Sequence, residues 1–181
     1  VLVTYALLGG TFGGIEIAAI AGLEAVGDKS RAGVVLGIWA AGSLVGGLAV
    51  TRLWHAPALR RLTLLLPVLV LAGVPLVLTA TSGWVWMSVA LTVDGIAIAP
   101  TIAAVYELIQ QISPPDALTE AFSWSIGAVV CGSALGTVVA GWLASHAGVE
   151  AAFVTAFAFP LLSTLWLRAV AGRDDPRRAV A

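Results

Sequence analysis

Two carboxylic acids lie inside long apolar stretches of this sequence, where ionisable side chains are rare. Glu16 is in the first stretch and Asp94 is near the middle of the fourth. An acid at the centre of a bilayer costs about 3 kcal/mol on insertion scales, so such a residue is a functional candidate by default. Burial favours the neutral form of a carboxyl group. Either residue could therefore exchange a proton, bind a cation or meet a cationic substrate.

Each acid also has a structural explanation. Glu16 could be a protonated, hydrogen-bonded carboxyl that only supports packing. Asp94 could cap a helix that breaks at Gly95, before Pro100. When the apolar stretches are threaded across a membrane, both acids fall slightly outside the midplane at a similar depth. We expect Glu16 to be the first candidate for proton exchange and Asp94 the second.

Two tryptophans lie deeper in the apolar stretches than the others. Most Trp residues of the chain are near the ends of these stretches, which is typical of anchors at the membrane interface. Trp39 and Trp124 are further in. We therefore count both as candidates for contact with a substrate.

Basic residues gather in the connection after the second apolar stretch. Arg52, Arg60 and Arg61 are found there, and we treat them as a candidate gating loop. Glu107 and Glu120 flank another connection that should lie on the same side of the membrane. We expect these acids to be interfacial, pairing with Arg52 or Arg61.

The composition requires a membrane. Of the 181 residues, 60% are hydrophobic and 10% are charged, whereas a soluble domain has about 25% charged residues. A helix needs roughly 20 apolar residues to span a bilayer. We predict an all-α bundle of six transmembrane helices over residues 1–171 and a disordered cytoplasmic tail over 172–181. The predicted spans are 1–26, 31–53, 62–82, 84–109, 121–145 and 151–170.

The placement of basic residues predicts the orientation of these spans. Of the nine basic residues, seven fall on one side of the membrane when six spans are threaded, and Lys29 and Arg31 are the exceptions. Because cytoplasmic loops carry an excess of Lys and Arg, this side should be cytoplasmic and should hold the C-terminus. The seven are Arg52, Arg60, Arg61, Arg168, Arg173, Arg177 and Arg178.

A shift of ninety positions places the second span on the fifth. The spacing Gly-x4-Gly-Ser-x2-Gly of residues 37–46 recurs in residues 127–136. The two spans run in opposite directions, so the chain would consist of two inverted three-helix repeats, a mark of secondary transporters. Both copies hold a small-xxx-small step, which lets helices approach closely in lipid.

Three stretches resemble the major facilitator superfamily, in particular the C-terminal six helices of actinobacterial efflux members. They are FGGIEI at 12–17, AGSLVGGL at 41–48, and PPDALTEAFSW at 114–124, which continues to AGWLASHAG at 140–148. The resemblance covers essentially the whole chain. The family's cytoplasmic loop motif has an altered copy in GLAVTR at 47–52, followed by Arg60 and Arg61, with Thr51 in place of its Asp.

The resemblance implies that the six spans are helices seven to twelve of a twelve-helix transporter in the plasma membrane. Since Val1 opens inside an apolar stretch, we expect a preceding six-helix half to complete it. Its partners would be that half, the lipid bilayer, a small molecule such as a drug or sugar, and protons. Transport would proceed by alternating access, and the substrate is expected to be exported.

Other classes of protein fit the sequence less well. A rhomboid protease needs a Gly-x-Ser-Gly nucleophile and an intramembrane His, and the only histidines, His55 and His146, are at span ends. Aquaporins need Asn-Pro-Ala, and the chain has no Asn. A six-helix channel or a non-transporting membrane protein stays as the alternative. We predict no catalytic residue, cofactor or metal site, and no nucleic-acid partner.

Overall fold

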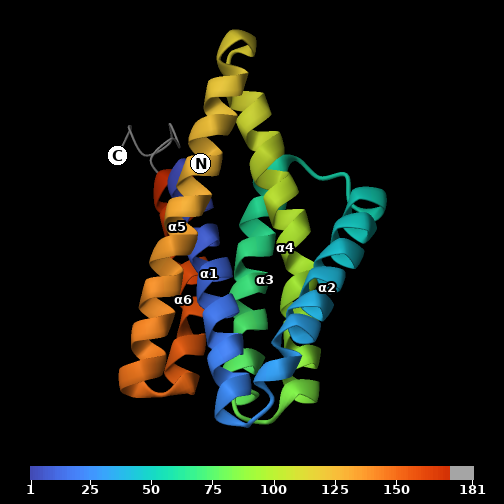
Figure 1. Cartoon of the computed structure of the whole chain (residues 1–181). Helices are drawn as coiled ribbons and strands as arrows, with labels where there is room; N and C mark the ends of the chain where they lie inside the picture. The colour runs from blue at the N-terminus through green and yellow to red at the C-terminus, as the bar shows by residue number, and fades with distance from the viewer. Residues whose placement is uncertain (172–181) are drawn as a thin grey trace, which may run out of the picture.

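Six long helices form an antiparallel bundle in the computed structural model, which describes residues 1–171 (Figure 1). Short 3-10 turns, η1 (Lys29–Arg31) and η2 (Pro115–Ala117), precede α2 and α5. The bounds of the helices are α1 Leu2–Ala25, α2 Ala32–Leu53, α3 Ala58–Leu78, α4 Trp84–Ile112, α5 Leu118–Ala147 and α6 Val149–Ala171.

The predicted all-α class with six spans is confirmed, because each helix is long and apolar enough to cross a membrane. Some bounds differ from the prediction. Helix α3 begins four residues early, at Ala58 after Pro57, which has no N–H to donate. Helix α4 is continuous through Gly95, so Asp94 is not a helix cap. The predicted tail, 172–181, lies outside the described residues.

The turns at one end of the bundle depend on glycine. Gly27 follows α1, Gly83 precedes α4, and Gly148 precedes α6, and their φ angles are 79°, 89° and 94°. A residue with a Cβ rarely adopts such positive φ values, so glycine is required at these sharp reversals. By the predicted orientation this end is external (lower end in Figure 1).

The fraction of buried residues in each helix follows the same order in the first three helices and in the last three. In the most apolar part of α1, α2 and α3, the buried shares of the residues are 61%, 17% and 44%. The same three values recur in α4, α5 and α6. Helices α2 and α5 are therefore the least covered elements, and the two three-helix units occupy equivalent places in the bundle.

The strongest helix pairs have matching contacts. Helix α2 packs most extensively on α4, and α1 packs most extensively on α5. A Cβ at Gly46 would collide with the carbonyl of Ile96, and a Cβ at Gly136 would collide with the carbonyl of Gly10. The two contacts are equivalent in the repeat. Gly46 of α2 corresponds to Gly136 of α5, 90 positions later, and Gly10 of α1 corresponds to Ile96 of α4, 86 positions later. Because α2 and α4 run opposite to α1 and α5, the symmetry is the predicted inverted one.

The contact at Gly46 falls where α4 lacks a hydrogen bond. The carbonyl of Ile96 would normally accept from the N–H of residue 100, but that residue is Pro100. Gly46 of α2 presents its Cα to this carbonyl, and a Cα–H···O contact is a weak substitute for the lost bond. The close approach of α2 therefore helps α4 to continue as a helix through Pro100.

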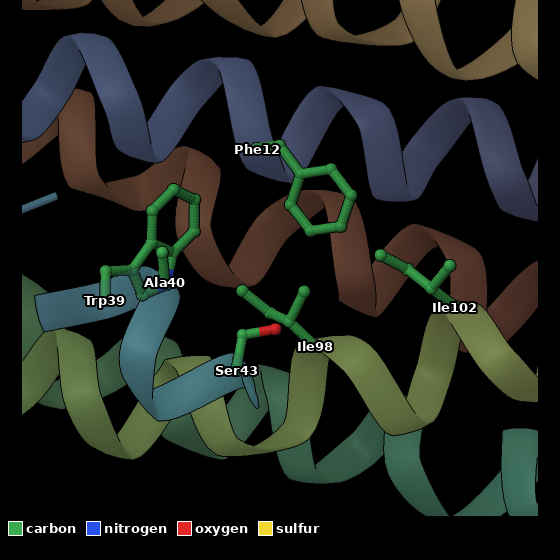
Figure 2. A pocket seen from close by; sticks show the side chains of 6 residues that line it. All are labelled: Phe12, Trp39, Ala40, Ser43, Ile98 and Ile102. Carbon is green, nitrogen blue, oxygen red and sulfur yellow. The ribbon is translucent and has the colours of Figure 1, made fainter. Parts of the chain in front are cut away.

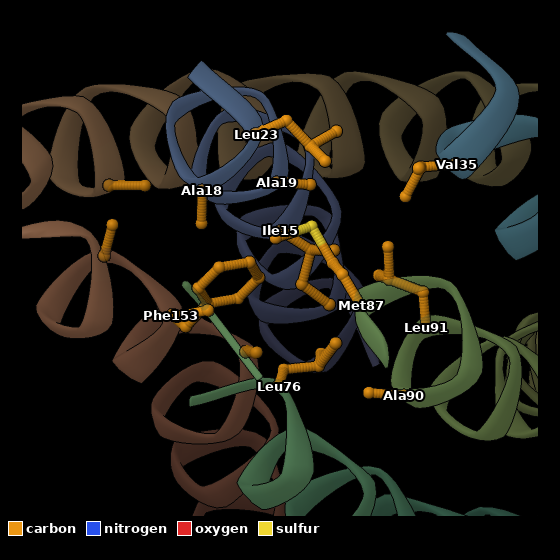
Figure 3. Packing of buried hydrophobic residues seen from close by; sticks show 14 residues of the cluster. Ile15, Ala18, Ala19, Leu23, Val35, Leu76, Met87, Ala90, Leu91 and Phe153 are labelled. Atoms are coloured by element: carbon orange, nitrogen blue, oxygen red, sulfur yellow. The ribbon is translucent and has the colours of Figure 1, made fainter. Parts of the chain in front are cut away.

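The centre of the bundle is filled by side chains from several helices. Toward the end that holds the three glycine turns, Ile15 of α1, Leu76 of α3, Met87 of α4 and Phe153 of α6 are fully buried in one cluster (Figure 3). A second cluster, around Tyr5, lies toward the other end. These layers fix α1 and α4 in the middle of the bundle, and both candidate acids are on these two helices.

Candidate functional site

Asp94 is fully buried and is held by a tryptophan of the neighbouring helix. The indole Nε1 of Trp39 donates a hydrogen bond to Asp94 Oδ2 at 3.0 Å. The other carboxyl oxygen, Oδ1, is buried and has no hydrogen-bond partner among the described residues. The two helices meet closely at this point, since a Cβ at Gly95 would lie 2.6 Å from the carbonyl oxygen of Trp39. The carboxyl group is therefore only half satisfied inside the membrane-spanning part of the bundle.

A groove lies beside this pair, between α1, α2 and α4 (Figure 2). Its volume is about 250 Å³. The rings of Phe12 and Trp39 meet edge to face, with centroids 6.4 Å apart. The lining is aliphatic and aromatic except for one hydroxyl group and the bonded indole N–H. It consists of Phe12, Trp39, Ala40, Ser43, Ile98 and Ile102.

Glu16 is one helical turn along α1 from Phe12 and is not among the residues that line this groove. Phe12 of α1 and Ile98 of α4 both line the groove, and the two helices are antiparallel. One turn from Phe12 is Glu16, and one turn from Ile98 in the same direction is Asp94, a step of about 6 Å along each helix. The two acids are therefore at a similar depth. Glu16 is exposed on its helix and has no hydrogen-bond or ion-pair partner within residues 1–171.

Trp124 is not brought to this site. Its side chain is 65% exposed near the start of α5, and its Nε1 donates to Oε1 of Glu120 at 3.2 Å. It lines a separate hollow with Ile112 of α4. The repeat explains the distance from the groove, because the position equivalent to Trp39 in α5 is Val129, five residues further along the helix.

The arginines of the candidate gating loop have different surroundings. Arg61 is buried in the first turn of α3 and forms an ion pair with Glu107 of α4, while its Nε has no partner in the described part of the chain. Arg52 and Arg60 are exposed. The expected pairing of Glu107 with Arg52 or Arg61 is thus formed by Arg61. This ion pair joins the beginning of α3 to the last part of α4, at the end of the bundle that is predicted to be cytoplasmic.

This ion pair should contribute measurably to stability. The side chain of Arg61 is 11% exposed and that of Glu107 is 41% exposed, whereas Lys29 and Glu24 form a pair at about 60% exposure. We expect Glu107→Gln to lower the free energy of unfolding by about 1–3 kcal/mol, since it leaves a mostly buried guanidinium without its counter-charge. Glu24→Gln is the control and should cost less than about 0.5 kcal/mol. Thermal unfolding in detergent measures both, and equal losses would contradict this difference.

Sequence reasoning missed several residues of the site. Phe12 precedes Glu16 by four residues, and Ile98 follows Asp94 by four, so helical spacing from each acid points to them. Tyr5 and Tyr106 were also missed. The hydroxyl of Tyr5 donates to that of Tyr106 at 3.0 Å, where α1 meets α4 one turn beyond Ile102. No local signal in the sequence indicates this contact, because its partners are 101 residues apart.

Inverted three-helix units around an intramembrane groove with a buried acid define a membrane transporter. The chain belongs to the Major Facilitator Superfamily, whose family model matches residues 1–180. The resemblance seen in the sequence is therefore confirmed at the level of the superfamily. No significant match was found among curated proteins or solved structures.

Proposed function

We propose that this chain is the C-terminal six-helix bundle of an efflux-type transporter that exchanges protons for a small molecule by alternating access. The observation that carries the proposal is Asp94, which is fully buried behind the groove and has one carboxyl oxygen without a partner. The hydrogen bond from Trp39 connects this acid to the lining of the groove.

The surroundings of Asp94 suit a proton that is taken up and released. An ionised carboxylate with an unpartnered oxygen in an apolar interior is costly, whereas the neutral acid carries no charge. The proton would leave when water reaches Oδ1. Since Trp39 lies between Asp94 and the groove, a substrate that displaces its indole ring would also remove a hydrogen bond from the acid. This contact supports coupling between substrate and proton.

A second six-helix bundle would complete the transporter. Helices α2 and α5 are mostly uncovered, and the groove beside α1 and α4 has an opposing wall only if another bundle faces it. We therefore retain the preceding half as a partner. In the proposed orientation Arg52, Arg60 and Arg168 are at the cytoplasmic end of the spans, in a plasma membrane.

Transport in vesicles tests the proposal. Proteoliposomes with the full-length protein and an imposed pH gradient would be incubated with a mixed library of sugars and aromatic drugs, and accumulated compounds identified by mass spectrometry. We expect saturable accumulation of at least one compound that disappears when nigericin collapses the gradient. Accumulation that is unaffected by nigericin would contradict proton coupling, and a flux that does not saturate would indicate a channel. Empty liposomes are the control.

A further inference from the structure

We infer that an anionic phospholipid binds at the connection between α2 and α3, with its phosphate group in a hollow beside the first turn of α3. The site is separate from the groove and goes beyond the proposed function, because its ligand belongs to the membrane and is not transported. The hollow has a volume of about 260 Å³. Its lining consists of Trp54, His55, Ala56, Arg61 and Glu107.

The connection between α2 and α3 carries uncompensated positive charge. Residues 51–62 include three arginines and one histidine and no acid. Glu107 of α4 neutralises Arg61 through their ion pair. Arg52 and Arg60 are exposed and have no ion-pair partner within residues 1–171. Clusters of unpaired basic residues at the end of a membrane-spanning bundle attract anionic lipid headgroups.

The first turn of α3 has the groups that recognise a phosphate. It follows Pro57 and contains neither a side-chain cap nor an acidic residue. The first N–H groups of a helix have no acceptor within the helix, and together with the helix dipole they favour anions.

Arg61 lies in this turn and lines the hollow. It is 9% exposed, and its Nε has no hydrogen-bond partner in the described part of the chain. Glu107 takes one Nη group of the guanidinium, which has five N–H donors in all. Because arginine binds phosphate oxygens with several donors at once, a phosphate group in the hollow would supply an acceptor that this buried guanidinium lacks.

The residues around the hollow indicate a lipid and not a free phosphate ion. The connection joins two membrane-spanning helices, so it lies at the depth of the headgroups. Leu53, the last residue of α2, is 82% exposed, and Leu59 in the first turn of α3 is 44% exposed. Trp54 lies between them and is typical of the membrane interface. Exposed apolar side chains beside an anion site match a ligand that carries acyl chains.

Two lipids that differ in headgroup charge test this inference. The full-length protein in detergent would be titrated with phosphatidylglycerol and, separately, with phosphatidylcholine of the same acyl chains, and bound lipids would be counted by native mass spectrometry. We expect the first phosphatidylglycerol to bind at least about fivefold more tightly, which is the gain from one basic residue near an anionic headgroup. Equal binding of the two lipids, or tighter binding of phosphatidylcholine, would overturn the inference.

Variants of two arginines locate the site. Arg60→Gln removes a charge without breaking the ion pair of Arg61, and it should weaken phosphatidylglycerol binding about fivefold. Arg61→Lys keeps a charge opposite Glu107 but loses the fork of donors, so it should weaken binding as well. Arg168→Gln is the matched control, because Arg168 is an exposed arginine in the last turn of α6, at the same end of the bundle. It should bind normally.

Equal losses in the Arg60 and Arg168 variants would mean a general attraction to this end of the bundle and no site at the α2–α3 connection. The comparison of the two lipids on the unaltered protein decides the matter even if a variant fails to fold.

Inorganic phosphate distinguishes a lipid site from a site for small anions. In large excess it should leave phosphatidylglycerol bound, because the free ion has no acyl chain to contact Leu53 and Leu59. Displacement of the lipid by phosphate would overturn the lipid as the occupant. Lipid binding is measured without transport, so its failure leaves the proposed function standing. A failure of proton-driven accumulation likewise leaves the lipid site standing.

Discussion

Asp94→Asn should abolish accumulation driven by a pH gradient while it leaves exchange of substrate for substrate in place. Asparagine has nearly the same volume as aspartic acid, and its carbonyl oxygen can still accept the hydrogen bond from Trp39. It cannot take up a proton. The loss of gradient-driven accumulation should therefore be complete, whereas folding and the shape of the groove should be retained.

Trp39→Phe is the informative companion of this variant. It keeps a ring in the groove but removes the donor to Asp94, so gradient-driven accumulation should be weakened but not abolished, because Asp94 can still take up a proton. Counterflow and gradient-driven accumulation would be measured for both variants and normalised to folded protein from thermal unfolding. Gradient-driven accumulation by Asp94→Asn at the unaltered rate would contradict the proposed role of Asp94 and would direct the search for the proton site to Glu16.

Gly136→Ala should destabilise the bundle strongly for so small a change. The added methyl group would collide with the backbone of Gly10, and backbone atoms cannot move aside as a flexible side chain can. Overpacking of this kind costs about 1–3 kcal/mol, which exceeds the gain of up to about 1 kcal/mol from replacing Gly by Ala in a helix. Gly46→Ala should behave in the same way against Ile96, since the two contacts are related by the repeat.

Glycines of the same two helices provide matched controls. A Cβ at Gly37 of α2 or at Gly127 of α5 has no neighbour within 4 Å among the described residues. Gly37→Ala and Gly127→Ala should therefore leave the unfolding temperature in detergent unchanged or raise it slightly. If all four variants shifted the temperature equally, close helix approach at Gly46 and Gly136 would not be the cause.

The number of helices could be predicted from the sequence because each span is a long apolar run bounded by turn residues. The repeat was visible in α2 and α5, where the glycines themselves make the contacts. The repeat was not visible in α1 and α4, because a comparison at a shift of 90 does not align them. These two helices are related by a shift of 86, which differs by about one helical turn. Gly9 and Gly95 make equivalent contacts on α5 and α2, but other equivalent residues of α1 and α4 differ in identity, as Gly10 and Ile96 do.

The site was only partly predictable for a different reason. Glu16 and Asp94 stand out as acids in apolar runs, which is a local property of the sequence. The bond between Trp39 and Asp94 joins residues 55 positions apart and depends on how α2 crosses α4. Trp124 looked equivalent to Trp39 by depth, yet the repeat places it on a different turn of α5. Tertiary packing decides which candidates meet.

The missing backbone bond at Pro100 makes the two central helices mechanically unequal. Bending a helix stretches or breaks hydrogen bonds on the outside of the bend, and α4 has one fewer to break between Ile96 and Pro100. Helix α1 contains no proline. This compliant point lies between Asp94 and Ile102, at the level of the groove. The wall of the groove formed by α4 can therefore bend at a lower energy than the wall formed by α1. Such bending would move the part of α4 that follows Pro100, which carries Glu107.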